Sequence, residues 1–184
     1  MNPLPANPQS AASAVPLRLG GGPRFTVLLG HEADATEAWH RTARGLLAAQ
    51  GVQTLVARTG REALGLIEDG AFGKGPRIHV AVLEQRMPVM GGLQILRRLQ
   101  QDLADQRQQK PAAMPASPQV PPAILLADSV AAGTMHEALS MHVFSVLPKP
   151  IELNLLLDTL ARALRRYYQN KWPETERLSG ERLS

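Results

Sequence analysis

The chain has 184 residues, of which 44% are apolar and 20% are charged, and its formal net charge is +4. This length suits one ordinary domain with tails. The absence of cysteine excludes disulfides, thiolate metal sites and thiol nucleophiles. No stretch approaches the roughly 18 consecutive apolar residues of a membrane helix, and the first residues lack a signal-peptide pattern. We therefore expect a cytoplasmic protein that does not contact a membrane.

Periodicity and strand-like apolar runs divide the chain into alternating elements. Residues 1–23 are poor in large apolar side chains and predict a disordered arm. In chain order, the predicted elements are a strand at 25–29, a helix at 34–50, a strand at 52–57, a helix at 59–70, a strand at 78–83, a helix at 92–101, a strand at 123–126, a helix at 134–141, a strand at 143–147 and a final helix from Leu153.

Ten of the 15 prolines lie in two segments, 1–23 and 102–122. The second segment is rich in Pro, Gln and Ala and is far longer than the usual two to six residues between a helix and a strand. We interpret 102–122 as a long insertion within a domain over 24–172, with a flexible tail at 173–184.

The predicted strands are continuous apolar runs, a pattern typical of a parallel sheet covered on both faces. Right-handed crossovers then favour an α/β fold: a doubly wound (βα)5 three-layer sandwich of the flavodoxin-like type, with a five-stranded parallel sheet. Ligand sites in such folds lie at the carboxyl ends of the strands. The residues that follow each strand are therefore the candidates for chemistry.

Three stretches resemble the receiver domain of two-component response regulators: Val82–Leu93 (VLEQRMPVMGGL), Thr59–Leu64 (TGREAL) and Leu147–Pro150 (LPKP). The likeness spans about 24–168. It implies a signalling module to which a histidine kinase transfers a phosphoryl group. The acceptor in that family is an aspartate at the end of the third strand, assisted by Mg²⁺ on an acidic pair, a Thr or Ser after strand four and a Lys after strand five.

Carried over position by position, most of that set has changed. The acceptor position is Glu84, the acidic pair falls on Gly30 and His31, and the hydroxyl position falls on Ala127. Lys149 and Pro150 match the family, and their peptide bond is expected to be cis, as in the family.

Three acids lie near the predicted site: Glu32 directly follows Gly30 and His31, and Asp34 or Asp128 would sit at its rim. We expect a degenerate pseudo-receiver, not an enzyme, that has no cofactor, binds Mg²⁺ weakly or not at all, and is not phosphorylated by the Asp/Mg mechanism. A working phosphoacceptor in a phosphorelay, using Glu84 or another acid, is the alternative.

Two interpretations of Glu84 remain open. It is either a solvated acid at a strand end in a decayed pocket, or a fixed partner of Lys149 that imitates the phosphorylated state. The histidines do not suggest a metal site: His31 and His79 are isolated, and His40, His136 and His142 have no ligand spacing.

The last helix predicts an interaction face. In the receiver family, the fourth helix, fifth strand and fifth helix form the output and dimer face, here about 134–141, 143–147 and 153–172; the aromatic switch position falls on Val146. We expect this face to bind protein partners, including a second copy of the chain. An alternative is that Tyr167 or Trp172 folds back on the core. The face residues are Leu153, Arg162, Arg165, Arg166, Tyr167, Tyr168 and Trp172.

A nucleic-acid partner is a weaker alternative, because the basic residues are spread along the chain. It would use arginines of the third and fifth helices, namely Arg97, Arg98, Arg162, Arg165 and Arg166.

Overall fold

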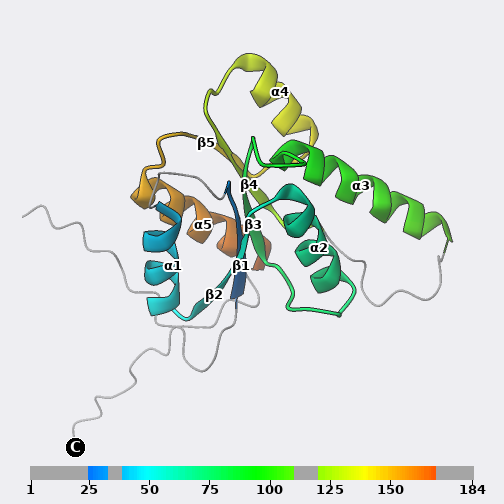
Figure 1. Ribbon diagram of the computed structural model, residues 1–184, viewed down its shortest axis with the longest axis horizontal. Helices are drawn as coiled ribbons and strands as arrows, with labels where there is room; N and C mark the ends of the chain where they lie inside the picture. The colour runs from blue at the N-terminus through cyan, green and yellow to red at the C-terminus, as the bar shows by residue number, and fades with distance from the viewer. Residues whose placement is uncertain (1–24, 33–38, 110–119, 169–184) are drawn as a thin grey trace, which may run out of the picture.

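The computed structural model describes residues 25–32, 39–109 and 120–168. Five parallel strands form one sheet in the order β2-β1-β3-β4-β5. Helices α1 and α5 lie on one side of the sheet, and α2 and α3 lie on the other (Figure 1). The predicted doubly wound (βα)5 sandwich is confirmed. Within the described residues, no helix has the length and apolar character needed to cross a membrane.

The chain alternates strictly between strand and helix. The elements are β1 (Phe25–Gly30), α1 (Trp39–Ala49), β2 (Val52–Ala57), α2 (Gly60–Ala71), β3 (Val80–Glu84), α3 (Gly92–Gln109), β4 (Ala123–Ala127), α4 (Ala132–Ser140), β5 (Ser145–Pro148) and α5 (Leu153–Tyr168).

The central strands β1, β3 and β4 are buried along their whole lengths. Because side chains alternate between faces, each strand feeds two cores. Val27, Val82 and Leu126 pack with α1 and α5, whereas Leu28 and Leu83 pack with α2 and α3. This two-sided burial explains the continuous apolar runs in the sequence.

Helix α3 differs most from its prediction. The sequence predicted an end near Gln101, but the helix continues to Gln109. Its second half projects beyond the sheet (Figure 1). The first eight residues of the segment predicted as an insertion, 102–109, are therefore helical. The cause is local: this stretch has no proline, and Leu, Ala, Gln and Arg are good helix formers.

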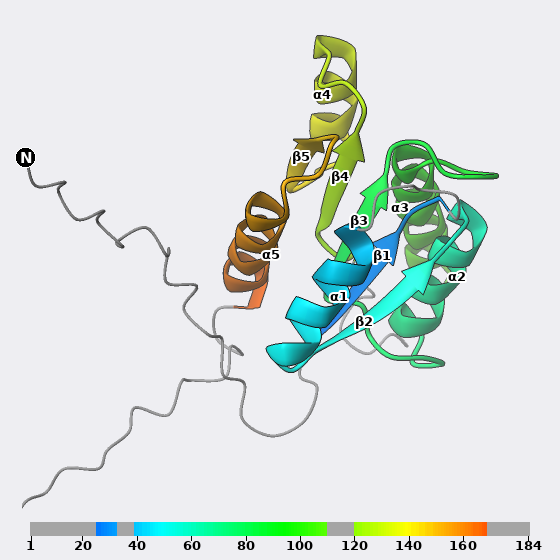
Figure 2. The same cartoon turned by 60° about the vertical axis from the view of Figure 1, so that its left-hand side comes forward.

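Helices α4 and α5 are held in different ways. Five residues of α5 are buried, and they form the stripe that packs on the sheet: Leu156, Thr159, Leu160, Ala163 and Leu164. In α4 the only buried residue is Ala138. Figure 2 shows α5 lying along the sheet while α4 stands out from it.

Candidate functional site

The register of the sheet brings the predicted site residues to one edge. Gly30 is opposite Leu83, Glu84 is opposite Leu126, and Ala127 is opposite Pro148. Backbone hydrogen bonds continue the ladders beyond the strands, from Gln85 N to Leu126 O (2.7 Å) and from Lys149 N to Ala127 O (2.9 Å). These bonds fix where the side chains of residues 84 and 149 begin.

Glu84 is buried, with 2% of its surface exposed. Its Oε2 accepts a hydrogen bond from the backbone N–H of Glu32 (3.2 Å), and its Oε1 lies 3.2 Å from Nζ of Lys149. Oε1 accepts no hydrogen bond, so its contact with the Lys149 ammonium is an ion pair. The interpretation of Glu84 as a solvated acid is wrong: both carboxylate oxygens face protein groups.

Lys149 and Asp128 extend this pairing toward the surface. The Lys149 side chain is 21% exposed, and its Nζ lies 3.9 Å from Oδ1 of Asp128. The other oxygen of Asp128 pairs with Nε of Arg86 at 3.5 Å. Asp128 therefore lies at the rim, as the sequence predicted, and its carboxylate pairs with Lys149 and Arg86. Asp34, the other predicted rim acid, lies outside the described residues.

The part of the site at the end of β1, which we call the β1 corner, consists of Gly30 and the ring side chains of His31, Trp39 and His40. Gly30 ends β1, and the buried His31 stacks on His40 with ring centroids 4.0 Å apart. Trp39 lies edge-on to both rings. Nδ1 of His31 is 2.8 Å from the carbonyl oxygen of Glu32, which can only accept; Nδ1 therefore carries the proton.

The donor set does not fit Mg²⁺, which prefers several oxygen ligands in octahedral geometry. Gly30 and His31 offer no side-chain oxygen, Ala127 has no hydroxyl, and Glu84 is engaged by Lys149 and the Glu32 amide. Across residues 25–32, 39–109 and 120–168, no group of three His, Asp or Glu side chains is placed to hold a metal ion.

The loop that follows Glu84 leaves no room for a side chain at Gly91 or Gly92. A Cβ on Gly92 would lie 2.8 Å from the carbonyl oxygen of Glu84 and 2.9 Å from Leu125. Gly91 directly precedes α3, and its N–H donates to Oε1 of Gln94 (3.0 Å). This bond is one half of a capping box. The two glycines that the sequence matched to the receiver family therefore have a structural role here. The Lys149–Pro150 bond is cis, as expected.

The predicted aromatic face is partly wrong. Tyr168 packs inward against Phe25 and His79, and its hydroxyl donates to the carbonyl oxygen of His79 (3.0 Å). Leu153 also packs against the core. Tyr167 is half-exposed and meets the ring of Phe144.

The charged residues of this face are exposed. Arg162 pairs with Asp158 one helical turn earlier, at 3.1 Å, and Arg165 and Arg166 lie on the surface of α5. Trp172 lies outside the described residues. The residue that folds back on the core is thus Tyr168, which the sequence had placed on the face.

The arginines named for a nucleic-acid partner do not lie on one face. The two helices pack on opposite sides of the sheet (Figure 1), α5 with α1 and α3 with α2. Arg97 and Arg98 are moreover paired with Glu137 and Asp102. A nucleic acid could not contact both arginine groups on one surface.

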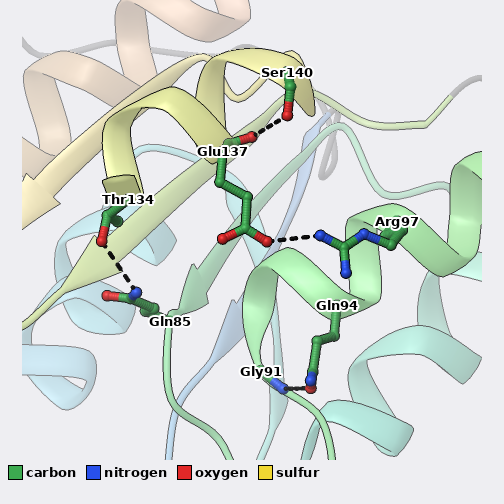
Figure 3. A network of polar contacts seen from close by, with 7 residues as sticks. All are labelled: Gln85, Gly91, Gln94, Arg97, Thr134, Glu137 and Ser140. Atoms are coloured by element: carbon green, nitrogen blue, oxygen red, sulfur yellow. Dashed lines mark hydrogen bonds and ion pairs between the residues drawn. The ribbon is translucent and has the colours of Figure 1, made fainter. Parts of the chain in front are cut away.

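A polar network between the β3–α3 region and α4 was not predictable from the sequence. Gln85, Arg97, Thr134 and Glu137 meet across the space between α3 and α4 (Figure 3). The partners are 40 or more residues apart in sequence, so no local pattern could have indicated them. His40 and Trp39 at the β1 corner were missed for a related reason, because helical spacing alone does not say which ring meets His31.

The fold is that of response-regulator receiver domains. Over 78% of this chain and 98% of the other, it superposes on a response regulator receiver domain from Francisella with a TM-score of 0.59 and 20% identity. A Vibrio cholerae chemotaxis protein, CheY4, gives a TM-score of 0.56 and 24% identity over 76% and 98% of the two chains.

The signal receiver domain of a LuxO repressor protein from Vibrio parahaemolyticus gives a TM-score of 0.60 and 20% identity, over 80% of this chain and 95% of that one. At the level of sequence, no family model and no curated protein matches the chain. The likeness is therefore one of fold, and the chemistry must be argued from the residues of this chain.

Proposed function

We propose that this protein is an atypical, receiver-like signalling module that acts by protein contact and is not phosphorylated by the Asp/Mg mechanism. The receiver fold supports a response-regulator role. The module passes on its signal through the α4–β5–α5 face, without catalysing a reaction of its own.

The observation that carries the proposal is the engagement of Glu84. A carboxylate can attack phosphorus only if an oxygen is free to approach it, and the developing charge must be neutralised by a metal ion. In this site one oxygen of Glu84 accepts from the Glu32 amide and the other faces the Lys149 ammonium. The lysine that would neutralise a phosphoryl group is already paired with a fixed negative charge.

This arrangement supports the interpretation of Glu84 as a permanent substitute for a phosphorylated aspartate. Its side chain is one methylene longer than aspartate, which lets the carboxylate reach Lys149 from the end of β3. The pair is present without any covalent modification. The module is therefore set in one signalling state, and its control lies in the abundance of its partner or in other parts of the fold.

The contact face carries exposed apolar groups. Leu139 on α4 is 66% exposed, and Leu155 and Tyr167 on α5 are 37% and 50% exposed. Exposed apolar groups flanked by arginine are typical of interface anchors. Arg162, Arg165 and Arg166 supply that flank on α5. A second copy of the chain is the partner that can be tested without further information.

Sedimentation velocity of the full chain tests the contact function. We expect concentration-dependent self-association that Mg²⁺ and acetyl phosphate leave unchanged. Leu155→Asp together with Tyr167→Asp should weaken it at least tenfold, whereas Leu46→Asp, at an exposed leucine of α1, should not. Association that appears only after treatment with acetyl phosphate would overturn the proposal in favour of a working phosphoacceptor.

A further inference from the structure

Helix α4 has little apolar attachment to the domain. Ala138 is its only buried residue, and Leu139 is 66% exposed. The residue before the helix, Ala131, makes no side-chain hydrogen bond to the first turn. A nine-residue helix is marginal in water when it stands alone. Something other than burial must therefore hold α4 in place.

Three polar links join α4 to the β3–α3 part of the chain. Nε2 of Gln85 donates to Oγ1 of Thr134 at the start of α4 (3.5 Å), and Nη2 of Arg97 donates to Oε1 of Glu137 in its middle (2.8 Å) (Figure 3). Nε2 of Gln100 donates to the carbonyl oxygen of Met141, directly after the helix (3.2 Å). The links are spaced along the whole helix.

The other end of each link is firmly anchored. Arg97 and Gln100 belong to α3, whose residues Ile95, Leu96 and Leu99 are buried in the core. Gln85 follows β3 and is fixed by the bond from its backbone N–H to Leu126. The links therefore run from a rigid support to a helix that has little support of its own.

From this asymmetry, we propose that the Gln85, Arg97 and Gln100 side chains form a clamp that sets the position of α4. When the clamp opens, α4 is released locally while the sheet and the other four helices stay folded. The hydroxyl position at the end of β4 is Ala127, whose side chain can make no hydrogen bond toward α4. The position of α4 is then controlled from α3 and Gln85, and not by a hydroxyl group at the end of β4.

Hydrogen–deuterium exchange of the full chain, read by mass spectrometry, tests the clamp. In Arg97→Ala the amides of 132–141 should exchange about two- to fivefold faster, since an exposed ion pair contributes up to about 1 kcal/mol. Removing all three links, with Gln85→Ala, Arg97→Ala and Gln100→Ala, should make the same amides exchange about tenfold faster. Exchange in β1, β3 and β4 should stay unchanged.

Arg98→Ala is the matched control. Arg98 is the next residue along α3 and forms an ion pair as well, but its partner is Asp102 on the same helix (3.0 Å). This variant should leave the exchange of α4 unchanged. The swapped pair, Arg97→Glu with Glu137→Arg, should restore much of the protection lost in Arg97→Ala.

Equal exchange of α4 in the wild type, in Arg97→Ala and in the triple variant would overturn the clamp. So would faster exchange that is uniform over the whole domain, which would show a global and not a local effect. The clamp does not depend on the proposed function. If α4 is released but self-association is unchanged, the clamp stands and the role of α4 in the contact face fails.

Discussion

The two corners of the candidate site are built from different chemistry. At the β3–β5 corner, Glu84 and Lys149 place an anion against a cation, and the fold holds the glutamate there. At the β1 corner there is no such charge pair. Gly30 and a buried stack of His31 on His40 stand where the family has metal-binding acids.

The difference shows which part of the site the fold itself requires. A charge pair between the ends of β3 and β5 joins two strands that flank β4, so it contributes to structure whether or not a phosphoryl group arrives. Acids at the end of β1 have no such role without a metal ion, because two adjacent carboxylates repel each other. Without a metal ion, packing alone decides what occupies that corner.

The largest effect is expected from breaking the Glu84–Lys149 ion pair at the β3–β5 corner. Lys149→Met keeps the length of the side chain but leaves the Glu84 carboxylate buried without its cation, and should cost about 3 kcal/mol in the free energy of unfolding. Urea denaturation measures it.

The double variant, Glu84→Gln with Lys149→Met, should recover most of that loss, since no unpaired charge remains buried. A loss below about 1 kcal/mol in Lys149→Met would mean that the pair behaves like an exposed one. The contrast between the two corners would then disappear.

Placing an acid at the β1 corner should not create a Mg²⁺ site. In Gly30→Asp the new Cβ would lie 2.9 Å from Leu83 Cδ2 and 3.1 Å from Met87 Sδ, and overpacking of this kind costs about 1–3 kcal/mol. Gly30→Ala is the control that adds the Cβ alone. Thermal unfolding with and without Mg²⁺ gives the result; a melting temperature that rises with Mg²⁺ in Gly30→Asp would show that the corner can still take the metal.

Replacement of His31 should be tolerated. His31→Leu has nearly the same volume and keeps an apolar contact with Trp39, but it loses the bond from Nδ1 to the Glu32 carbonyl. The expected loss of stability is below about 1.5 kcal/mol, about half of that in Lys149→Met. Urea denaturation compares the two directly. A loss as large as that of Lys149→Met would assign the β1 corner a polar role.

His79 lies just before β3, at the opposite end of the strands, and we expect the smallest effect there; it serves as a reference for a partly buried histidine. Burial, followed by the nearby Arg77, lowers the pKa of His79, and its unprotonated Nδ1 accepts from the N–H of Thr26 (3.0 Å). The unfolded chain therefore binds the proton more readily than the folded one.

It follows that the contribution of His79 to stability is fully present above about pH 6.5 and is lost as the pH falls toward the folded-state pKa. Urea denaturation between pH 7.5 and 5 should show this loss, and His79→Gln should flatten it. Stability that rises as the pH falls, and does so only when His79 is present, would contradict the assignment.

The sequence was informative where a feature depends on neighbouring residues. The strands are predictable because they are apolar on both faces, and α2 because Thr59 accepts from the N–H of Glu62 as a helix cap should. The contact of Glu84 with Lys149 follows from two strand ends at one edge of a parallel sheet. The inward packing of Tyr168 was predictable, since this residue lies four positions after the buried Leu164 on the same stripe of the helix.

The remaining features depend on partners distant in sequence. The burial of Glu84 needs the amide of Glu32, and the links to α4 join residues of α3 and β3 to a helix some 40 positions later. The end of α3 is not evident from the composition of 102–122 as a whole, because the prolines of this segment begin only at Pro111, after the helical residues end.

We propose that the pairing of Glu84 with Lys149, together with the lack of side-chain oxygens at Gly30, His31 and Ala127, prevents metal-dependent phosphorylation. The most direct measurement is the intact mass of the full chain after incubation with acetyl phosphate and Mg²⁺, beside that of Glu84→Asp. We predict no added phosphoryl group on either protein, because Gly30, His31 and Ala127 cannot complete the site even for an aspartate. A stable phosphoryl adduct on an acidic residue of the wild-type chain, located by peptide mapping, would contradict the account.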